Sequence, residues 1–167
     1  SNFNSMSPLI TKIKAKCLVS TGRVIEGRDL CIEITRKNPN DCSAWIDLGY
    51  MAWSMGDYNR VLTCGKMIEQ LDSSLSEHSL FKGIALINLG HFKEAIQELT
   101  IAKSYNDTLN FEPILSLAEN KFSKSHQETP IRQNVDVKTA DGGGKQLDES
   151  HQMREIVNVE QFIPLTP

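Results

Sequence analysis

The sequence predicts an all-α protein built from a repeated pair of helices, because one pattern of small and apolar residues is written twice at a fixed spacing. Residues 42–109 carry both copies, and each key position recurs after 34 residues. The matched positions are Gly49 and Gly83, Gly56 and Gly90, Tyr58 and Phe92, and Val61 and Ala95. A period of this length is typical of helix-turn-helix units, which stack into a solenoid with one concave face.

The period also predicts where the individual repeats lie. Taking Gly56 back by the same step gives Gly22, so the repeats are expected at residues 8–41, 42–75 and 76–109. The first repeat is the least regular, since Gly27 stands where the others have Val61 and Ala95. Helices of this length are not stable alone in water, so the three units are expected to bury their apolar sides against one another.

Capping residues support the predicted helix starts. Asp41 and Asp57 precede the two helices of the second repeat, and aspartate is a preferred N-cap residue. Pro39 is expected to end the first repeat, because proline cannot continue a helix. Apolar spacing continues after the third repeat and predicts a capping helix at 110–122, with Pro113 in its first turn.

The C-terminal part of the chain has a different composition. Residues 123–152 are rich in polar residues and glycine and are predicted to be a flexible linker. Apolar residues return at 153–165, which we interpret as a docking segment or as the start of a further, truncated domain. The apolar side chains of this tail are Ile156, Val157, Val159, Phe162, Ile163 and Leu165.

The overall composition excludes several functional classes. The chain has 167 residues, of which 40% are hydrophobic, and a formal net charge of −3. It has no basic run interleaved with aromatic residues, so no nucleic-acid partner is expected. It also has neither a signal-peptide layout nor a run of about 18 apolar residues, so we expect a cytoplasmic protein without a membrane span.

The cysteines and histidines give no sign of a metal or catalytic site. No two of the four cysteines form a Cys-x-x-Cys motif; they are Cys17, Cys31, Cys42 and Cys64. We expect them to be reduced thiols that fill helix-packing positions. The histidines are His78, His91, His126 and His151. They are scattered and are expected to be solvated or capping residues. No catalytic residue, metal ligand or cofactor is therefore predicted.

Residues 8–122 resemble the tetratricopeptide repeat family. The resemblance is carried by Trp45, Leu48, Gly49, Gly56, Asp57, Tyr58 and Val61 in the second repeat, and by Gly83, Gly90, Phe92, Lys93, Glu94, Ala95 and Ile96 in the third. It implies three repeats with a capping helix, wound into an α-α superhelix. It also implies a non-enzymatic, protein-binding function such as that of a scaffold or adaptor.

The resemblance further implies a peptide-binding groove lined by the first helix of each repeat. The positions that usually face the ligand carry over to Lys12, Lys16, Ile46, Tyr50, Trp53, Leu80, Ile84, Ile87 and Asn88. This gives one basic end and an apolar middle and far end. An exposed apolar patch of this kind normally marks a binding site. The alternative is that these side chains are core, covered by neighbouring helices or by the tail.

One familiar ligand of the family is not favoured. Members that hold the C-terminal carboxylate of heat-shock chaperones use a clamp of basic and amide side chains. Lys12 suits that clamp, but Lys16, Asp47, Glu77 and Phe81 occupy its other positions. Glu77 would repel a carboxylate.

Several functions stay open at this stage. The first is binding of an apolar helix or an extended peptide, including the chain's own tail or that of a neighbour. The second is a chaperone of the type III secretion class that shields an apolar client segment, and the third is the N-terminal regulatory part of a larger enzyme. Homo-oligomerisation through the tail or a terminal repeat is a further alternative.

Overall fold

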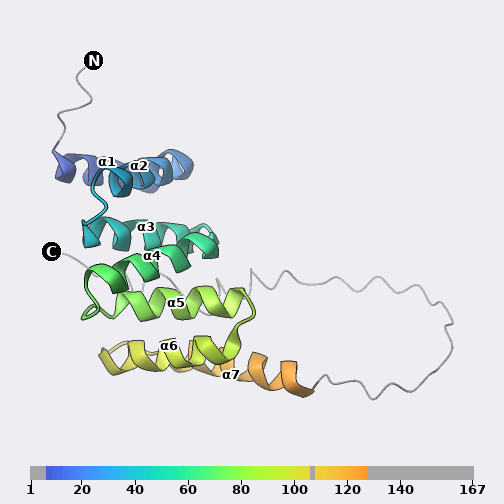
Figure 1. Ribbon diagram of the computed structural model, residues 1–167. Coiled ribbons are helices and arrows are strands. Elements are labelled where there is room, and N and C mark those ends of the chain that lie inside the picture. Colours follow the sequence, from blue (N-terminus) through green and yellow to red (C-terminus); the bar gives the residue numbers. More distant parts are fainter. Residues whose placement is uncertain (1–6, 106–107, 128–167) are drawn as a thin grey trace, which may run out of the picture.

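The computed structural model describes residues 7–105 and 108–127, which form seven helices and no strand (Figure 1). The helices stack in chain order: α1 (Pro8–Ser20), α2 (Val24–Lys37), α3 (Cys42–Ser54), α4 (Tyr58–Leu71), α5 (Glu77–Asn88), α6 (Phe92–Tyr105) and α7 (Glu112–Gln127). Three helical pairs followed by a seventh helix confirm the predicted all-α solenoid.

The same glycine turn joins the two helices of every pair. Gly22, Gly56 and Gly90 have φ angles of 82°, 74° and 83°, a left-handed conformation that favours glycine. In each turn the amide after the glycine donates to a carbonyl five residues earlier, as Asp57 N does to Ala52 O at 2.9 Å. These bonds satisfy carbonyls at the helix end. The 34-residue period of the sequence therefore reflects a helix C-cap that recurs in every repeat.

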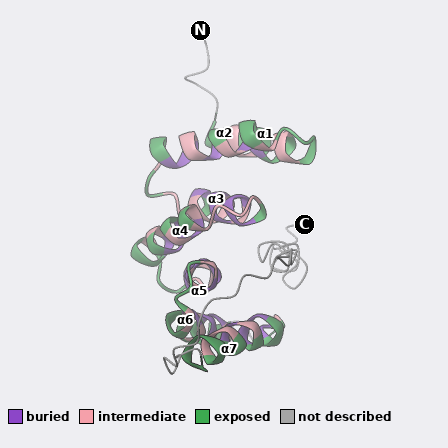
Figure 2. Ribbon diagram, turned by 90° about the vertical axis from the view of Figure 1, so that its right-hand side faces the viewer, coloured by how far each residue is buried: buried purple, intermediate pink, exposed green. Residues whose placement is uncertain are grey.

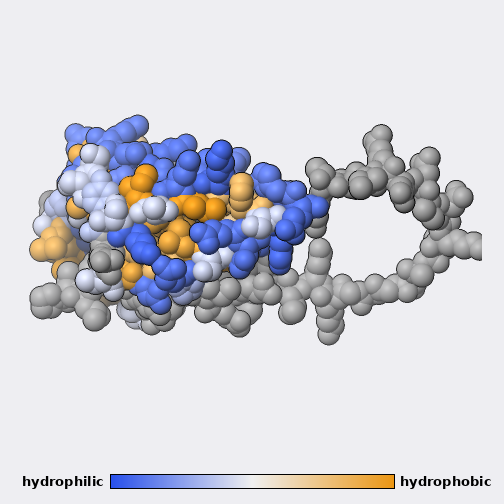
Figure 3. Space-filling view, turned by 90° about the horizontal axis from the view of Figure 1, so that it is seen from below, coloured by the Kyte–Doolittle hydropathy of each residue, from blue (hydrophilic) through white to orange (hydrophobic). Residues whose placement is uncertain are grey.

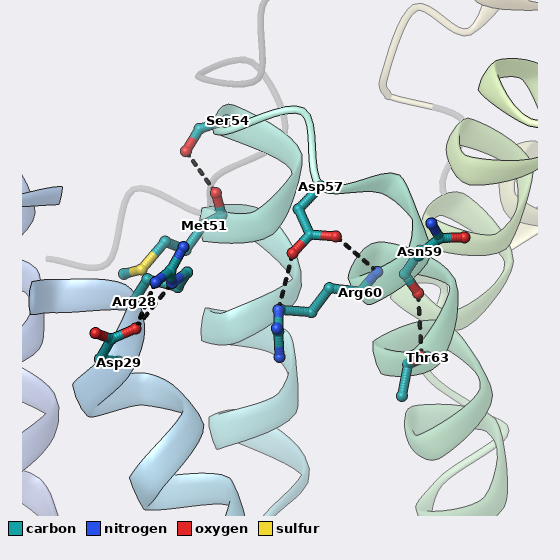
Figure 4. Close-up of polar contacts among 8 residues, drawn as sticks. All are labelled: Arg28, Asp29, Met51, Ser54, Asp57, Asn59, Arg60 and Thr63. Carbon is teal, nitrogen blue, oxygen red and sulfur yellow. Dashed lines mark hydrogen bonds and ion pairs between the residues drawn. The ribbon is translucent and has the colours of Figure 1, made fainter. Parts of the chain in front are cut away.

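The predicted N-caps of the second repeat are present. The Asp41 side chain accepts a hydrogen bond from the Ala44 amide at 3.2 Å. The Asp57 side chain accepts one from the Arg60 amide at 3.2 Å and also contacts the Arg60 guanidinium (Figure 4). In the first repeat, Arg23 precedes α2 and gives no side-chain cap.

Two glycines at equivalent positions allow the helices to cross closely. A Cβ atom added at Gly49 would overlap the ring of Phe81, which is 0% exposed. A Cβ atom added at Gly83 would lie 2.6 Å from Leu99 Cγ. The repeated small residues thus correspond to close contacts of α3 with the Phe81 side chain of α5, and of α5 with Leu99 of α6.

The core lies mainly in the second and third repeats and the capping helix (Figure 2). Ala15 is the one buried residue of α1, whereas α5 has nine buried residues. The largest fully buried apolar side chains include Phe81, Phe111 and Leu48. The two ends of the stack therefore differ in how well they are covered.

The capping helix is longer than the sequence pattern predicts. It ends at Gln127 instead of Phe122, so its last turn takes residues assigned to the linker. Local contacts explain the extension. The Ser125 hydroxyl donates to the Phe122 carbonyl at 2.7 Å, and the rings of Phe122 and His126 lie 4.2 Å apart. The rest of the linker and the whole segment 153–165 lie outside the described residues.

Two expectations about single residues are wrong. His78 is 5% exposed instead of solvated, because its ring nitrogens contact the Ser73 carbonyl and the Ser79 hydroxyl, both at 3.1 Å. Cys17 is exposed instead of packed, because no described helix precedes α1 to cover it. Cys31 and Cys64 are buried as expected, and burial raises the pKa of Cys31 to about 11 and that of Cys64 to about 12.

None of the described helices combines the length and the apolar character needed to cross a membrane.

Candidate peptide-binding groove

The predicted groove residues lie on the first helix of each pair. Lys12 and Lys16 are on α1, Ile46, Tyr50 and Trp53 on α3, and Leu80, Ile84, Ile87 and Asn88 on α5. Spacings of three and four residues place each set on one side of its helix. These three helices follow one another along the stack (Figure 1), so the arrangement can present one surface that crosses all three repeats.

The basic end of this surface is occupied by contacts between repeats. The Lys12 ammonium contacts Asp41 Oδ2 at 2.6 Å and donates to Ser43 Oγ at 2.5 Å. The Lys16 ammonium lies 3.6 Å from Asp47 Oδ1. Both lysines therefore link α1 to the start and middle of α3, where they neutralise the carboxylates of Asp41 and Asp47.

The two carboxylates respond differently to their surroundings. Burial would raise the pKa of Asp41, but the hydrogen bonds from Lys12 and from the Ala44 amide outweigh it and hold this pKa below its usual value. For Asp47 burial is the larger effect, and the pKa is raised although Lys16 and Lys12 act in the other direction. The pair of Lys12 and Asp41 is thus the firmer of the two ionic contacts.

The apolar part of the surface is closed in the intact chain. Trp53, Leu80, Ile84 and Ile87 are 4%, 3%, 0% and 3% exposed. Ile46, Tyr50 and Asn88 are partly buried, and the Asn88 side chain donates to the Ile84 carbonyl at 3.0 Å. A ligand that contacts the four buried side chains must first displace the groups packed on them.

Three aromatic rings form the centre of the surface. Tyr50 stacks on Trp53 with ring centroids 6.3 Å apart, and it meets Phe81 edge-on at 4.9 Å. Burial raises the pKa of the Tyr50 phenol, and Glu77 adds to this effect. The phenol therefore stays neutral at physiological pH. The cluster connects α3 to α5 and supplies large apolar anchors of the kind that dominate binding energy.

Phe81 was not among the predicted groove residues. Its equivalents in the other repeats are Ile13 and Asp47, so the 34-residue period gives no sign of a buried ring at this position. The available signal was Gly49, because a glycine in the middle of a helix leaves room for a large side chain from the first helix of the next repeat.

A charged cluster between α4, α5 and α6 was also missed. The Lys82 ammonium contacts Glu69 Oε1 at 2.8 Å and Glu98 Oε1 at 2.9 Å, and the residue is 8% exposed. Burial would lower the pKa of Lys82, but the two glutamates outweigh it and raise this pKa. The hydrogen bond from Lys82 in turn lowers the pKa of Glu69. The cluster joins three helices and holds no nucleophile.

Other site chemistry is limited. Within residues 7–105 and 108–127, no group of three or more His, Cys, Asp or Glu side chains is placed to hold a metal ion. The predicted tail residues from Ile156 to Leu165 lie outside those ranges. The groove side chains themselves offer apolar and aromatic contacts and partly buried amide and phenol groups, which suit binding.

No protein-family model matches the chain, and no curated protein matches it either. Solved structures do. The first repeat domain of human RPAP3 is 12% identical, with a TM-score of 0.64 over 72% of this chain and 96% of that one. MamA AMB-1 is 18% identical, with a TM-score of 0.65 over 76% of each chain.

A third solved structure contains a ligand. The Yersinia enterocolitica type III secretion chaperone SycD, in complex with a peptide of the translocator YopD, is 13% identical, with a TM-score of 0.57 over 76% of this chain and 99% of that one. Together with the helical pairs described above, these similarities show that the chain has the tetratricopeptide-repeat fold.

Proposed function

We propose that this chain is a non-enzymatic protein-interaction module whose concave side binds an apolar helix or an extended peptide. The observation that carries the proposal is the aromatic cluster of Tyr50, Trp53 and Phe81, continued along α5 by Leu80, Ile84 and Ile87. A preformed surface of this kind lowers the ordering cost of a bound peptide. Two similar structures hold peptides, one of HSP90 in Spaghetti and one of YopD in SycD.

A chaperone-type carboxylate is a poor match for this groove. Lys12 and Lys16 already pair with Asp41 and Asp47, and Phe81 is fully buried. A free carboxylate would have to displace an existing ionic partner from a lysine. The proposed ligand is therefore recognised by apolar side chains, with main-chain polar groups as the secondary contacts.

The first occupant that we propose is the chain's own segment 153–165. Four of the groove side chains are at most 4% exposed, so the groups that pack on them must be displaced before a partner binds. A linker of about 25 residues spans roughly 28 Å as a coil, which is enough to return to the stack and gives an effective concentration in the millimolar range. The tail offers Val159, Phe162 and Ile163 as anchors.

The likeness to SycD favours a second candidate, a chaperone that shields the apolar segment of one client. In this case the groove residues are the same, but the ligand belongs to another chain. Tight co-purification with a single aggregation-prone protein would distinguish this function from that of a reversible adaptor.

The test uses Trp53 as the only tryptophan, in full-length protein with Trp45→Phe. Replacing Phe162 and Ile163 by Asp should move the Trp53 emission to longer wavelength and increase its quenching by acrylamide, because the groove would then open to water. A synthetic peptide of residues 153–165 should reverse both effects. The matched control is Thr166→Asp, which adds charge beside the segment.

Two results would contradict parts of this proposal. Unchanged emission in the Phe162 and Ile163 variant would reject the tail as occupant and leave the groove available to another ligand. If Trp53→Ala and Ile84→Ala retain full binding of a partner that is found to bind the wild type, the groove itself is not the binding site.

A further inference from the structure

The seventh helix has the position of a first helix in a fourth repeat. Like α3 on α2 and α5 on α4, it packs on the helix that precedes it in the chain. The 34-residue period relates Leu80 to Ile114, which is 1% exposed, and it relates Ile84 to Ala118, which is 0% exposed. Both residues of α7 are thus buried like their equivalents on α5. The side of α5 that carries the groove residues therefore continues on α7.

The helix α7 does not end where the other first helices do. Lys124 stands at the position that the turn glycine has in the three pairs, so no left-handed glycine turn ends the helix there. It continues to Gln127 and extends past the end of α5 (Figure 1). Figure 3 views the end of the stack that α6 and α7 form, where hydrophilic side chains surround a narrower hydrophobic area. This polar surface suits a helix that closes the array.

An aromatic pair lies in the last turns of α7. Phe122 is the equivalent of Asn88, the last of the predicted groove residues. His126 follows one turn later, and the centroids of the two rings lie 4.2 Å apart. The Nδ1 atom of His126 lies 2.9 Å from the Phe122 carbonyl oxygen, which holds the imidazole beside the phenyl ring. Phe122 is partly buried and His126 is exposed, so part of the pair is accessible to a ligand.

The two ends of the groove therefore differ in chemistry. At the α1 end, each of the two groove lysines already pairs with an aspartate. At the α7 end, the equivalents of Ile87 and Asn88 are Lys121 and Phe122, and the phenyl ring provides apolar area. An apolar ligand thus buries more apolar surface by extending from α5 toward α7 than by extending toward α1.

We propose, on the basis of the function proposed above, that α7 is a fourth wall of the groove and that Phe122 is a binding residue for the segment 153–165. The segment is tethered at this end of the groove, because only residues 128–152 separate it from the end of α7. When extended it spans roughly 40 Å. This exceeds the combined width of α3 and α5, since a helix with its side chains is about 10–12 Å across. The segment therefore has the length to contact a third helix.

The test measures the binding of a fluorescein-labelled peptide of residues 153–165 by fluorescence anisotropy. The parent protein is the full chain with Phe162→Asp and Ile163→Asp, whose own segment no longer competes. Adding Phe122→Ala should raise the dissociation constant about tenfold, as for a central binding residue. Phe122→Leu keeps an apolar side chain and should bind within about threefold of the parent. The matched control is Ile101→Ala, which should leave the constant unchanged, because Ile101 is 43% exposed on α6.

Circular dichroism should give the same helicity for all variants, since Phe122 is partly exposed near a helix end. The role of Phe122 is overturned, and the proposed occupant is retained, if Phe122→Ala is fully helical and binds the peptide like the parent. If Phe122→Ala loses helicity, His126→Ala at the exposed neighbouring position decides, and unchanged binding by that variant overturns the proposal. A parent that does not bind the peptide would reject both the occupant and the role of Phe122.

Discussion

The first and third repeats share a spacing but differ in what surrounds them. Ile13 and Phe81 occupy the same position in their repeats, yet Ile13 is 53% exposed and Phe81 is fully buried. The third repeat packs between the second repeat and α7, whereas within the described residues the first packs on one side only. The comparison teaches that, in this fold, burial is decided by neighbouring repeats more than by the position within a helix.

This difference also concerns stability. In a solenoid the free energy is close to a sum of terms for each repeat and each interface between repeats. Among the described helices the first repeat has one such interface, so we expect α1 and α2 to open before α3–α7.

The largest expected difference is between truncations of Phe81 and Ile13. Phe81→Ala should lower the free energy of unfolding by about 3–5 kcal/mol, because it leaves a cavity between α3 and α5. Ile13→Ala should change it by about 0.5 kcal/mol or less, as an exposed substitution. Urea unfolding followed by circular dichroism measures both. Equal losses would mean that the first and third repeats are equally well packed at this position.

The next comparison adds a methyl group to two glycines. Gly49→Ala should cost up to about 3 kcal/mol, because the new atom would overlap the buried Phe81 ring. Gly27→Ala should cost less, about 1 kcal/mol. Its Cβ would lie 2.7 Å from Cγ2 of the partly exposed Val19 and 3.1 Å from the Ala15 carbonyl oxygen, and the higher helix propensity of alanine offsets only part of this strain. A stabilising effect at Gly49 would contradict the close contact of the Phe81 ring with α3.

A third comparison removes two lysines at equivalent positions. Lys82→Met should cost about 2 kcal/mol, because it leaves Glu98 partly buried beside Glu69 without their common cation. Lys14→Met should have little effect, since an exposed charge contributes little. Urea unfolding at neutral pH provides the measurement.

The pH dependence of the Lys82 contribution has a definite sign. Folding raises the pKa of Lys82, so its contribution is present at neutral pH and is lost only as the pH rises through this raised value. Folding lowers the pKa of Glu69 below its ordinary 4.5, so the contribution of that carboxylate is lost as the pH falls below this value. The difference between the wild type and Lys82→Met should narrow in acid. A constant difference would exclude an ionic contribution.

Much of the fold could be predicted because its determinants are local. Gly22, Gly56 and Gly90 each need a left-handed turn, and an aspartate before a helix caps it, so the period and the helix starts follow from short stretches of sequence. The end of α7 could not be predicted in this way. It depends on the contacts of Phe122 with Ser125 and His126, in a stretch whose composition is that of a linker.

The candidate site was harder to predict because the pairing and burial of its side chains depend on contacts between repeats. The family pattern places Lys12 and Lys16 in the groove, but their pairing with Asp41 and Asp47 depends on how α1 lies against α3. The burial of Ile84 likewise depends on packing that a period cannot express. Side chains such as Phe81 and Lys82 differ from their equivalents in the other repeats, so the repeat period alone does not predict their contacts.

The smallest expected effect on stability concerns substitutions at the N-caps of α4 and α2. Asp57→Ala should cost about 1 kcal/mol, because the Arg60 amide loses its acceptor at the start of α4 (Figure 4). Arg23→Asp at the equivalent position should raise the midpoint of urea unfolding, since α2 has no side-chain cap and Glu26 would complete a capping box.

The control for this last comparison is Arg23→Ala, which removes the ion pair with Glu26 without adding a cap. Only Arg23→Asp should increase the protection of the first α2 amides against hydrogen exchange. If both Arg23 variants unfold alike, the missing cap does not limit the first repeat. Its weaker packing would then follow from the outer side of α1, which no described helix covers.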